Sequence, residues 1–345
     1  MALRVAINGL GRIGRAFLKV GIKRPELEIV AVNDLGDMDN MAYLLKYDSA
    51  YGHSGLDVHA EKNADGSGVL VIDGKRIAVL QQKDPAALPW RDLNVDVVIE
   101  STGFFEEYAK AKLHLDAGAK KVVISAPAKG QPVEGVTGAT VLMGINEDKL
   151  AGCKISSNAS CTTNAAAPLI QILHEAIGIE KASLSTVHGY TGTQKLVDSP
   201  DAKDWRRGRA AAHNIVPSTT GAAIAVTLAI PDLVGKFDGI AIRVPVITGS
   251  IADITFIAKR DTTVEEVNSI LKAAAATERW SKVFTVTEEQ LVSSDIVGSS
   301  YASIADLTLT NVVGGNLVKV LAWYDNEMGY THALVEHVIK TGAVG

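Results

Sequence analysis

Three glycines near the start of the chain constrain its fold more than any other feature. Gly9, Gly11 and Gly14 form a G-x-G-x-x-G motif that follows an apolar, strand-like run and opens a helical pattern. Asp34 ends the next apolar run, twenty positions after Gly14. This arrangement is typical of a βαβ unit whose tight turn admits a pyrophosphate. A purely structural turn remains the alternative, but the position between strand and helix favours dinucleotide binding.

The acidic residue also indicates which dinucleotide is bound. A carboxylate at Asp34 can accept hydrogen bonds from the adenosine ribose hydroxyls, and it would repel a 2′-phosphate. The free N–H groups at the start of the following helix favour the negative charge of a pyrophosphate. The sequence therefore predicts NAD rather than NADP.

Strand and helix patterns alternate up to about residue 150, as in α/β proteins. The expected strands are 4–8, 29–33, 95–101, 121–125 and 141–145, and the expected helices are 12–23, 39–46 and 106–117. The strands are almost wholly apolar, as expected when both faces of a sheet are covered. The segment 57–76 breaks this rhythm and predicts a hairpin, with Asp65-Gly66 and Asp73-Gly74 as turn signals.

The pattern changes after Cys161. Runs that alternate apolar and polar residues predict half-solvated antiparallel strands at 181–188, 239–244, 251–259 and 317–324, and helical patterns cover 162–177, 221–229, 264–276 and 328–340. The predicted architecture is an α/β chain with a doubly wound parallel Rossmann sheet over 1–160, completed by a C-terminal helix in 326–345. A second, α+β domain with a mostly antiparallel sheet is expected over 161–325.

Composition excludes several classes of protein. With 47% apolar residues, the chain of 345 residues has ample material for buried cores, unlike a disordered chain. Its net charge of −5 gives no indication of a basic surface for binding nucleic acid or an anionic membrane. The start resembles no signal peptide, and the apolar stretch 222–230 is far shorter than the roughly 18 residues of a membrane span. Two cysteines are too few for a disulfide scaffold in such a chain, so we expect a reducing compartment.

Cys161 is a candidate nucleophile because it lies between a strand and an amphipathic helix, in the segment Ser157-Asn-Ala-Ser-Cys-Thr-Thr-Asn164. With Ser160 or Asn158 as the helix cap, its sulfur would lie in the first turn, where the helix dipole favours a thiolate. A buried, inert cysteine is an equally open interpretation. Cys153 has no comparable setting and is expected to be structural.

Among eight histidines, His188 is the first candidate for a general base. It ends a predicted strand and precedes a glycine, and strand ends are where scaffolds display catalytic side chains. His213 and His174 remain rivals at this level. No cluster of His, Cys or Asp has metal-ligand spacing, so no metal is predicted.

Basic and hydroxyl side chains indicate binding of anions. Arg243 stands alone within the apolar run 240–245, where a guanidinium needs a partner such as phosphate or carboxylate. The segment Ser218-Thr-Thr-Gly221 adds hydroxyl and backbone donors at a helix start. Arg206 and Arg209 are expected in salt bridges within or between subunits, and Arg207 could serve either purpose.

The segment around Cys161 closely resembles the active-site signature of the phosphorylating glyceraldehyde-3-phosphate dehydrogenases. The resemblance spans essentially the whole chain, in order, through Ile7-Asn-Gly-Leu-Gly-Arg-Ile-Gly-Arg15, Val32-Asn-Asp34, Leu44-Leu-Lys-Tyr-Asp48, Glu100-Ser-Thr-Gly-Phe104, Ile124-Ser-Ala-Pro-Ala-Lys129, Pro217-Ser-Thr-Thr-Gly-Ala-Ala223, Arg243-Val-Pro245 and Trp323-Tyr-Asp-Asn-Glu327. It implies oxidation of glyceraldehyde 3-phosphate with NAD and inorganic phosphate through a thioester, in glycolysis or gluconeogenesis, by a cytoplasmic homotetramer.

The resemblance also implies a role for each matching residue. Cys161 would be the nucleophile and His188 the base. The cofactor would be bound by Gly9, Gly11, Arg12, Ile13, Gly14, Asp34, Lys83, Thr102, Ser125 and Asn326, the last of these orienting the nicotinamide carboxamide. The substrate phosphate and inorganic phosphate would be bound by Ser160, Thr162, Thr191, Arg207, Thr220, Gly221 and Arg243. The stretch 190–213 would be the loop that reaches a neighbouring subunit's cofactor site.

Three positions depart from the family pattern. Ala165 replaces a second cysteine, which removes one route to an intramolecular disulfide, and Ile224 replaces a frequent lysine. The segment Val197-Asp-Ser-Pro200 only approximates the NAD-type loop, so some use of NADP stays open. The alternatives are erythrose-4-phosphate dehydrogenase, a semialdehyde dehydrogenase, and a non-catalytic dinucleotide-binding or RNA-associated protein.

Overall fold

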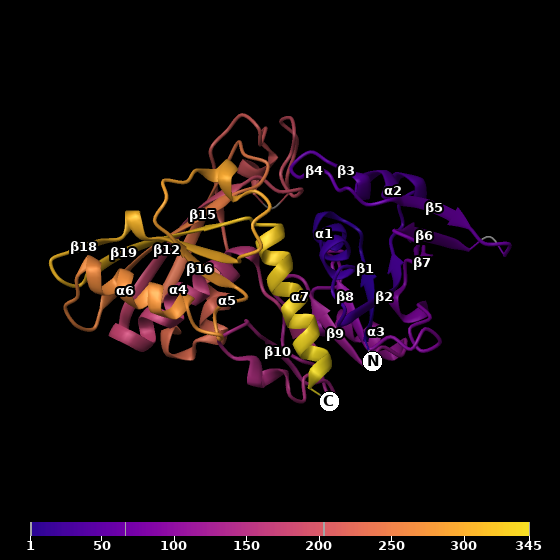
Figure 1. The fold of residues 1–345 in the computed structure, drawn as a ribbon, viewed down its shortest axis with the longest axis horizontal. Coiled ribbons are helices and arrows are strands. Elements are labelled where there is room, and N and C mark those ends of the chain that lie inside the picture. Colours follow the sequence, from indigo (N-terminus) through magenta and orange to yellow (C-terminus); the bar gives the residue numbers. More distant parts are fainter. Residues whose placement is uncertain (1, 66, 203, 345) are drawn as a thin grey trace. The chain divides into compact units, whose positions relative to one another are not determined.

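The computed structural model describes residues 2–65, 67–202 and 204–344 (Figure 1). The chain divides into two compact units. The first unit comprises Met1–Val141, Glu147–Ala159 and Leu334–Gly345, and the second comprises Leu142–Asn146 and Ser160–Ala333.

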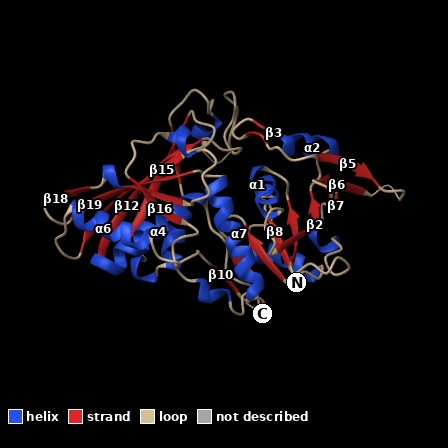
Figure 2. Ribbon diagram, viewed as in Figure 1, coloured by secondary structure: helices blue, strands red, loops and turns tan. Residues whose placement is uncertain are grey.

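The first unit alternates strands with helices, as the sequence predicted (Figure 2). Its strands are β1 (Leu3–Asn8), β2 (Leu27–Asn33), β3 (Tyr47–Asp48), β4 (Gly52–His53), β5 (Val58–Lys62), β6 (Gly68–Ile72), β7 (Lys75–Leu80), β8 (Val97–Glu100), β9 (Lys121–Ile124), β10 (Gly138–Thr140) and β11 (Ile155–Ser157). Its helices are α1 (Arg12–Gly21), α2 (Met38–Lys46) and α3 (Tyr108–Asp116), with short 3₁₀ turns η1 (Pro85–Ala87) and η2 (Glu147–Leu150). The last helix of the chain, α7 (Met328–Ala343), ends in this unit.

The main sheet of this unit has the order β10-β11-β9-β8-β1-β2-β7-β6-β5. All pairs from β10 to β7 are parallel, and β5 and β6 extend the sheet by antiparallel pairing. Successive strands therefore build outward from β1 in both directions, which is the topology of a doubly wound sheet with its switch point at β1. The predicted α/β class is confirmed.

The first unit contains the hairpin that the sequence predicted over 57–76. The predicted hairpin is present as β5 and β6, while Asp73 and Gly74 adopt the positive φ values of a tight turn that leads on to β7. The other turn signal includes Gly66, which lies outside the described residues.

The second half of α7 is held by a buried histidine, His337. Its ring nitrogens lie 2.8 Å from Ser156 Oγ and 3.0 Å from Asn158 Oδ1.

The strand expected at 141–145 is wrong. Strand β10 ends at Thr140, and the following residues form turns. The side chain of Asn146 accepts a hydrogen bond from the Leu142 N–H at 2.8 Å, and the Ile145 N–H donates to the Leu142 carbonyl. An apolar run is therefore bent into a turn because an asparagine supplies the acceptor that a neighbouring strand would have offered.

The second unit consists of strands that pack on one long helix. Its strands are β12 (Ile179–Gly189), β13 (Val216–Thr219), β14 (Phe237–Val244), β15 (Ser250–Ala258), β16 (Phe284–Thr287), β17 (Ser303–Asp306), β18 (Asn311–Val313) and β19 (Leu317–Tyr324). Its helices are α4 (Cys161–Ile177), α5 (Ala222–Ala229), α6 (Val264–Ala275) and the start of α7, with 3₁₀ turns η3 (Trp205–Gly208), η4 (Pro231–Leu233), η5 (Ser293–Ile296) and η6 (Leu307–Leu309).

These strands form one sheet in the order β13-β14-β12-β15-β19-β17-β16, with β18 paired to β19. Most pairs are antiparallel, as predicted, but β16 runs parallel to β17, and β12 runs parallel to β14. Strands β12 and β14 can do so because the chain between them is long enough for a crossover that contains β13 and α5. Side chains along β15 alternate between buried and half-buried, so the sheet has one core face and one open face.

Helix α4 packs on the core face against β12, β15, β17 and β19. The sequence fixes both of its ends. Ser160 caps the start by accepting from the Thr163 N–H at 3.1 Å, and Gly178, with a φ of 68°, ends the helix. The first residue of the helix, Cys161, is thereby held at the edge of the sheet.

Candidate active site

The glycine loop of the first unit is closely packed on its neighbours. Gly9 has a φ of 98°, and a Cβ there would lie 2.8 Å from the backbone of Ser101 and Thr102. A Cβ at Gly14 would overlap the Gly9 carbonyl oxygen. Gly11 has no atom within 4 Å of a built Cβ, so this side of the loop is open. The loop thus combines a tight turn with an accessible backbone at the start of α1, which fits a pyrophosphate.

Asp34 follows β2 and is tied to this loop. Its Oδ2 accepts from the Leu10 N–H at 2.7 Å, and its Oδ1 accepts from the Gly36 N–H at 2.9 Å. Each carboxylate oxygen has a second lone pair, so the held carboxylate can still accept from hydroxyl groups. The geometry is that expected of a ribose acceptor.

The predicted cofactor residues of this unit gather at one edge of the sheet. Gly9, Asp34, Lys83, Thr102 and Ser125 follow the carboxyl ends of β1, β2, β7, β8 and β9, respectively. Carboxyl ends of parallel strands are where open α/β sheets bind ligands.

Arg12 and Ile13 lie in the first turn of α1, beside that edge. The Arg12 guanidinium donates to Asp48 Oδ2 at 2.6 Å and lies over the Tyr51 ring. Burial by itself would raise the pKa of Asp48, but the hydrogen bonds from Arg12 and the Ala50 N–H, together with the charges of Arg12 and Lys19, lower it overall. Arg12 is therefore positioned by a carboxylate rather than free in solvent.

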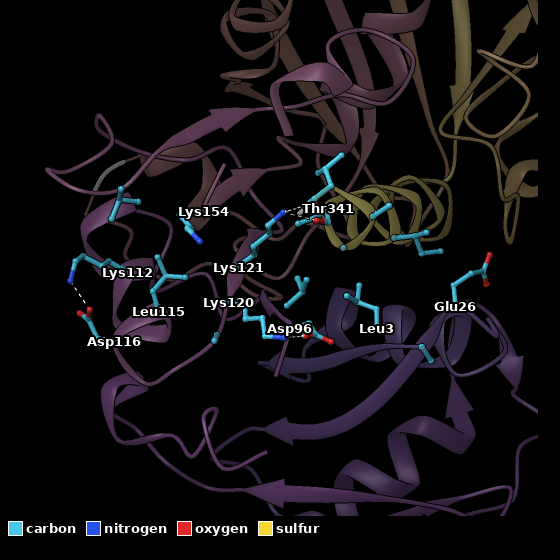
Figure 3. A pocket seen from close by; sticks show the side chains of 18 of the residues that line it. Leu3, Glu26, Asp96, Lys112, Leu115, Asp116, Lys120, Lys121, Lys154 and Thr341 are labelled. Carbon is cyan, nitrogen blue, oxygen red and sulfur yellow. Dashed lines mark hydrogen bonds and ion pairs between the residues drawn. The ribbon is translucent and has the colours of Figure 1, made fainter. Parts of the chain in front are cut away.

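A cavity of about 1210 Å³ lies at the opposite edge of the same sheet, as Figure 3 shows. Its lining includes Leu3 and Lys121, the first residues of β1 and β9. Lys120 is paired with Asp96 at 2.7 Å, and Lys121 donates to the Thr341 carbonyl at 2.9 Å. The cavity is thus remote from the glycine loop, and these two lysines serve to hold the unit together.

In the second unit, the structure brings three predicted residues into contact. Cys161 Sγ lies 3.4 Å from His188 Nε2, and the His188 Nδ1 lies 2.6 Å from Arg243 Nη1. They come from the start of α4 and from the ends of the parallel pair β12 and β14, where His188 and Arg243 are in register. The candidate nucleophile, the candidate base and a cation therefore form one continuous row.

The contacts of His188 Nδ1 allow two tautomers. The Gly189 carbonyl oxygen lies 2.6 Å away and would accept a proton from Nδ1, which leaves Nε2 free to take a proton from the thiol. Alternatively, Nδ1 accepts from Arg243, and Nε2–H then points toward the sulfur. The position of Arg243 therefore decides whether His188 faces Cys161 as acceptor or donor.

Burial controls the charge of these groups. Desolvation, with Arg243 adding to it, lowers the pKa of His188 to about 3, so the imidazole is neutral at physiological pH. Burial raises the pKa of the Cys161 thiol, while Arg243 and the N–H and hydroxyl of Thr162 act in the opposite direction. A neutral imidazole beside a thiol can accept a proton, which is the requirement for a general base.

Tyr324 is a member of this site that sequence reasoning passed over. Its hydroxyl lies 2.9 Å from Thr162 Oγ1 and 2.7 Å from Thr186 Oγ1, and its ring meets the His188 ring edge-on. Tyr324 belongs to the segment 323–327 that resembles the family, but a tyrosine at the end of a strand gives no functional signal of its own. The Tyr324 ring therefore packs against the imidazole of His188, and its hydroxyl forms a hydrogen bond with that of Thr162.

Other residues that the sequence predicted to bind anions lie in the same unit. Arg207 donates to Ser218 Oγ at 2.7 Å, and Thr220 and Gly221 precede the first turn of α5. Burial lowers the pKa of Arg243, and the charge of Arg207 lowers it further, so the two guanidinium groups are close enough to repel each other. A bound anion would relieve this repulsion.

Two more predicted residues have partners that orient them. Thr191 follows β12, and its hydroxyl contacts that of Thr193 at 3.0 Å. The buried Asn326 uses its Oδ1 to accept from the Gly249 N–H and the Ser250 hydroxyl, at 3.1 and 3.0 Å. Its Oδ1 is thereby held by hydrogen bonds within the second unit.

The rival residues lie apart from the row. His174 accepts from the Ile179 N–H at the far end of α4, and His213 is exposed. Cys153 is buried in the first unit, with its sulfur 2.9 Å from the Lys149 carbonyl oxygen. Arg209 pairs with Asp198 at 2.9 Å. Among the described residues, no group of three His, Cys, Asp or Glu could hold a metal ion.

Comparison with known proteins gives one family for both units. Residues 3–108 match the NAD-binding domain of glyceraldehyde 3-phosphate dehydrogenase, and residues 160–326 match the C-terminal domain of the same family. The chain is 47% identical to the glyceraldehyde-3-phosphate dehydrogenase of Geobacillus stearothermophilus, over 97% of each chain. It is 51% identical to that of Thermotoga maritima, over 96% of this chain and 97% of the relative. In the part of the chain that is described, no helix has the length and apolar character needed to cross a membrane.

Proposed function

The chain belongs to the glyceraldehyde 3-phosphate dehydrogenase family and is therefore an NAD-dependent oxidoreductase that acts on an aldehyde in glycolysis, and we propose that Cys161 and His188 carry its reaction. The observation that supports these roles is the contact of 3.4 Å between Cys161 Sγ and His188 Nε2 at a helix start. The substrate is glyceraldehyde 3-phosphate, and the second substrate in our proposal is inorganic phosphate.

The residues of the first unit fit the cofactor. The glycine loop has no room for a Cβ at two positions and is open at the third, as a bound pyrophosphate requires. We assign Gly9, Gly11, Arg12, Ile13, Gly14, Asp34, Lys83, Thr102 and Ser125 to its nucleotide half, and Asn326 to its carboxamide. Bound NAD supplies the acceptor for the hydride that leaves the substrate.

Cys161 begins the reaction by attacking the aldehyde carbon. His188 takes the thiol proton through Nε2 and passes it to the carbonyl oxygen, so the product is a neutral hemithioacetal on sulfur. His188 then takes the hydroxyl proton as the carbon loses its hydride, which leaves a thioester on Cys161. A base in this position typically contributes about 10²–10⁴-fold to the rate.

Inorganic phosphate completes the reaction by attacking the thioester carbon. The carbon–sulfur bond breaks, an acyl phosphate leaves, and the sulfur recovers the proton held by His188. Splitting one difficult oxidation into two steps is the benefit of covalent catalysis. Since both the substrate and the attacking group carry phosphate charge, two anion sites are required. We assign them to Arg243, Thr191 and Arg207, and to Ser160, Thr162, Thr220 and Gly221.

Replacing Arg243 by alanine is expected to affect binding more than chemistry. The KM for glyceraldehyde 3-phosphate should rise by at least about tenfold, because a charge-assisted contact is worth roughly 1.5–3 kcal/mol. Since Arg243 also lowers the pKa of Cys161, the variant should react more slowly with the neutral reagent iodoacetamide at fixed pH. Steady-state kinetics and alkylation rates measure both effects. The exposed Arg209, paired with Asp198, is the control, and an unchanged KM would remove Arg243 from the phosphate site.

The proposed reaction is tested by following NADH formation from glyceraldehyde 3-phosphate with and without inorganic phosphate. We expect turnover only when phosphate is present, and a lower kcat/KM with erythrose 4-phosphate. Equal or better turnover of erythrose 4-phosphate would favour erythrose-4-phosphate dehydrogenase, and phosphate-independent turnover would contradict the acyl-phosphate product.

We also propose that the chain forms a homotetramer in the cytoplasm. The support is an apolar surface: Val187, Ile240 and Leu317 lie on strands of the second unit's sheet and are 37–50% exposed in the single chain. Uncovered apolar surface of this kind is typical of subunit contacts. Sedimentation equilibrium should give about four times the chain's mass, and a stable monomer would contradict the proposal.

A further inference from the structure

A polar network with a buried centre lies within the first unit. His114 on α3 is 0% exposed, and Glu100 at the end of β8 is 2% exposed. The indole N–H of Trp90 donates to His114 Nδ1 at 3.0 Å. Because this nitrogen is an acceptor, the proton of a neutral His114 lies on Nε2, which faces Glu100 Oε2 at 3.0 Å.

Glu100 accepts hydrogen bonds on both carboxylate oxygens. Besides His114, its Oε2 accepts from Asn8 Nδ2 at 2.6 Å. Its Oε1 accepts from the backbone N–H of Thr102 at 2.8 Å and from the Thr102 hydroxyl. Four donors therefore converge on one carboxylate, which makes this buried acceptor well satisfied.

The network continues across the ends of two more strands. Asn8, the last residue of β1, accepts from Asn33 Nδ2 at 2.7 Å through its Oδ1. Asn33, the last residue of β2, in turn accepts from the Gln82 N–H at 2.9 Å. Asn8 immediately precedes the glycine loop, and Asn33 immediately precedes Asp34.

We infer that Glu100 is a positioning residue for NAD binding. Its carboxylate fixes Thr102, the glycine loop and Asp34 relative to one another. The inference rests on the cofactor contacts assigned above. Parallel strands pair through backbone hydrogen bonds that end with the strand, so side chains must hold the loops that follow. Here one carboxylate holds the loop after β8 directly, and those after β1 and β2 through Asn8 and Asn33.

A glutamine at this position would have nearly the same shape but the wrong polarity. Whichever end carries the NH₂ group, it would face two donors, either those of Thr102 or those of Asn8 and His114. The local hydrogen bonds break in both orientations, so the loops lose their common support. We therefore expect Glu100→Gln to weaken NAD binding at least tenfold, measured as a Kd by titration calorimetry.

Direct binding separates this inference from the proposed reaction. If the wild-type chain binds NAD but shows no phosphate-dependent turnover, the proposed reaction fails and the calorimetric comparison still decides the role of Glu100. In an active enzyme, Glu100→Gln should raise the KM for NAD at least tenfold while the KM for inorganic phosphate changes less than about twofold. A Kd within twofold of the wild type would overturn the inference.

Asp96→Asn is the matched control, because it makes the same chemical change at the other end of the same strand. Asp96 directly precedes β8, where it accepts from the Arg4 N–H at 2.8 Å and pairs with Lys120. We expect this variant to lower thermal stability without changing the Kd for NAD. If both variants weaken NAD binding equally, a general loss of stability explains the effect and the positioning role is wrong.

The double variant Asn8→Asp/Glu100→Gln tests the polarity of the network itself. An aspartate at position 8 can accept from the NH₂ group of the introduced glutamine and from Asn33, so the amide oxygen of that glutamine can again face Thr102. The contact with His114 is not restored, and we expect the Kd to recover at least threefold relative to Glu100→Gln. This comparison also holds if Glu100→Gln fails to fold, since the folded double variant should then bind NAD. A folded double variant without NAD binding would contradict the inference.

Discussion

The Cys161→Ser variant is expected to lose at least about 10⁴-fold in kcat, since removal of a covalent nucleophile eliminates the step on which the others depend. A serine hydroxyl titrates far above the range in which a thiol ionises, so it is a much weaker nucleophile at the same position. No thioester can form, so no acyl phosphate can leave. NAD binding should be retained, because the assigned nucleotide contacts lie in the first unit.

Turnover and calorimetric NAD binding should be measured on the same preparation of this variant. Cys153→Ser is the matched control, since it makes the same change at a buried cysteine whose sulfur lies 2.9 Å from the Lys149 carbonyl oxygen. It should keep kcat within a few-fold of the wild type. Wild-type turnover by Cys161→Ser would refute the assignment of the nucleophile.

The His188→Gln variant is expected to lose about 10²–10⁴-fold in kcat, which is the usual contribution of a general base. Glutamine can occupy much of the space between Cys161 and Arg243, but it cannot accept and return a proton. The KM for NAD should change little. His174→Gln is the control, because His174 contacts the backbone at the far end of α4. A loss of less than about threefold would assign the proton transfer to another group.

Burial of His188 also predicts a dependence of stability on pH. Its pKa is about 3 in the folded chain, against an ordinary value near 6.5, so the unfolded state binds more protons between these values. The neutral imidazole therefore contributes stability that is complete above pH 6.5 and is lost as the pH falls toward 3. The thermal unfolding midpoint of His188→Gln should therefore fall less steeply than that of the wild type between pH 6.5 and 3. The buried His337, whose pKa is also lowered to about 3, contributes to the fall in both proteins.

Much of the fold could be predicted because its signals are local. The apolar runs that precede Asp34 and Cys161 and the glycines of the first loop predicted strands, helix starts and a parallel sheet correctly. The failure at 141–145 came from Asn146, whose side chain bonds a backbone N–H in a turn. The parallel pairing of β12 and β14 also escaped prediction, because strand direction within a sheet depends on a crossover rather than on the alternation of side chains.

The candidate site was predictable in its members but not in its contacts. Position at a helix start singled out Cys161, while His188 became convincing only through resemblance, since three histidines fitted the residue pattern. Neither Tyr324 nor Glu100 could be proposed from spacing. Each is the last residue of its strand, and its role depends on which polar groups the fold brings to it.

The amino-acid sequence by itself determined the classes of element, the dinucleotide loop and the family, because glycine conformation, apolar periodicity and motif order are properties of neighbouring residues. Only the tertiary structure decided that an imidazole meets the sulfur, that a guanidinium reaches the other ring nitrogen, and that four donors meet on Glu100. The pairs Cys161–His188, His188–Arg243 and Asn8–Glu100 are 27, 55 and 92 positions apart, and such separations are closed by packing of whole elements rather than by local preference.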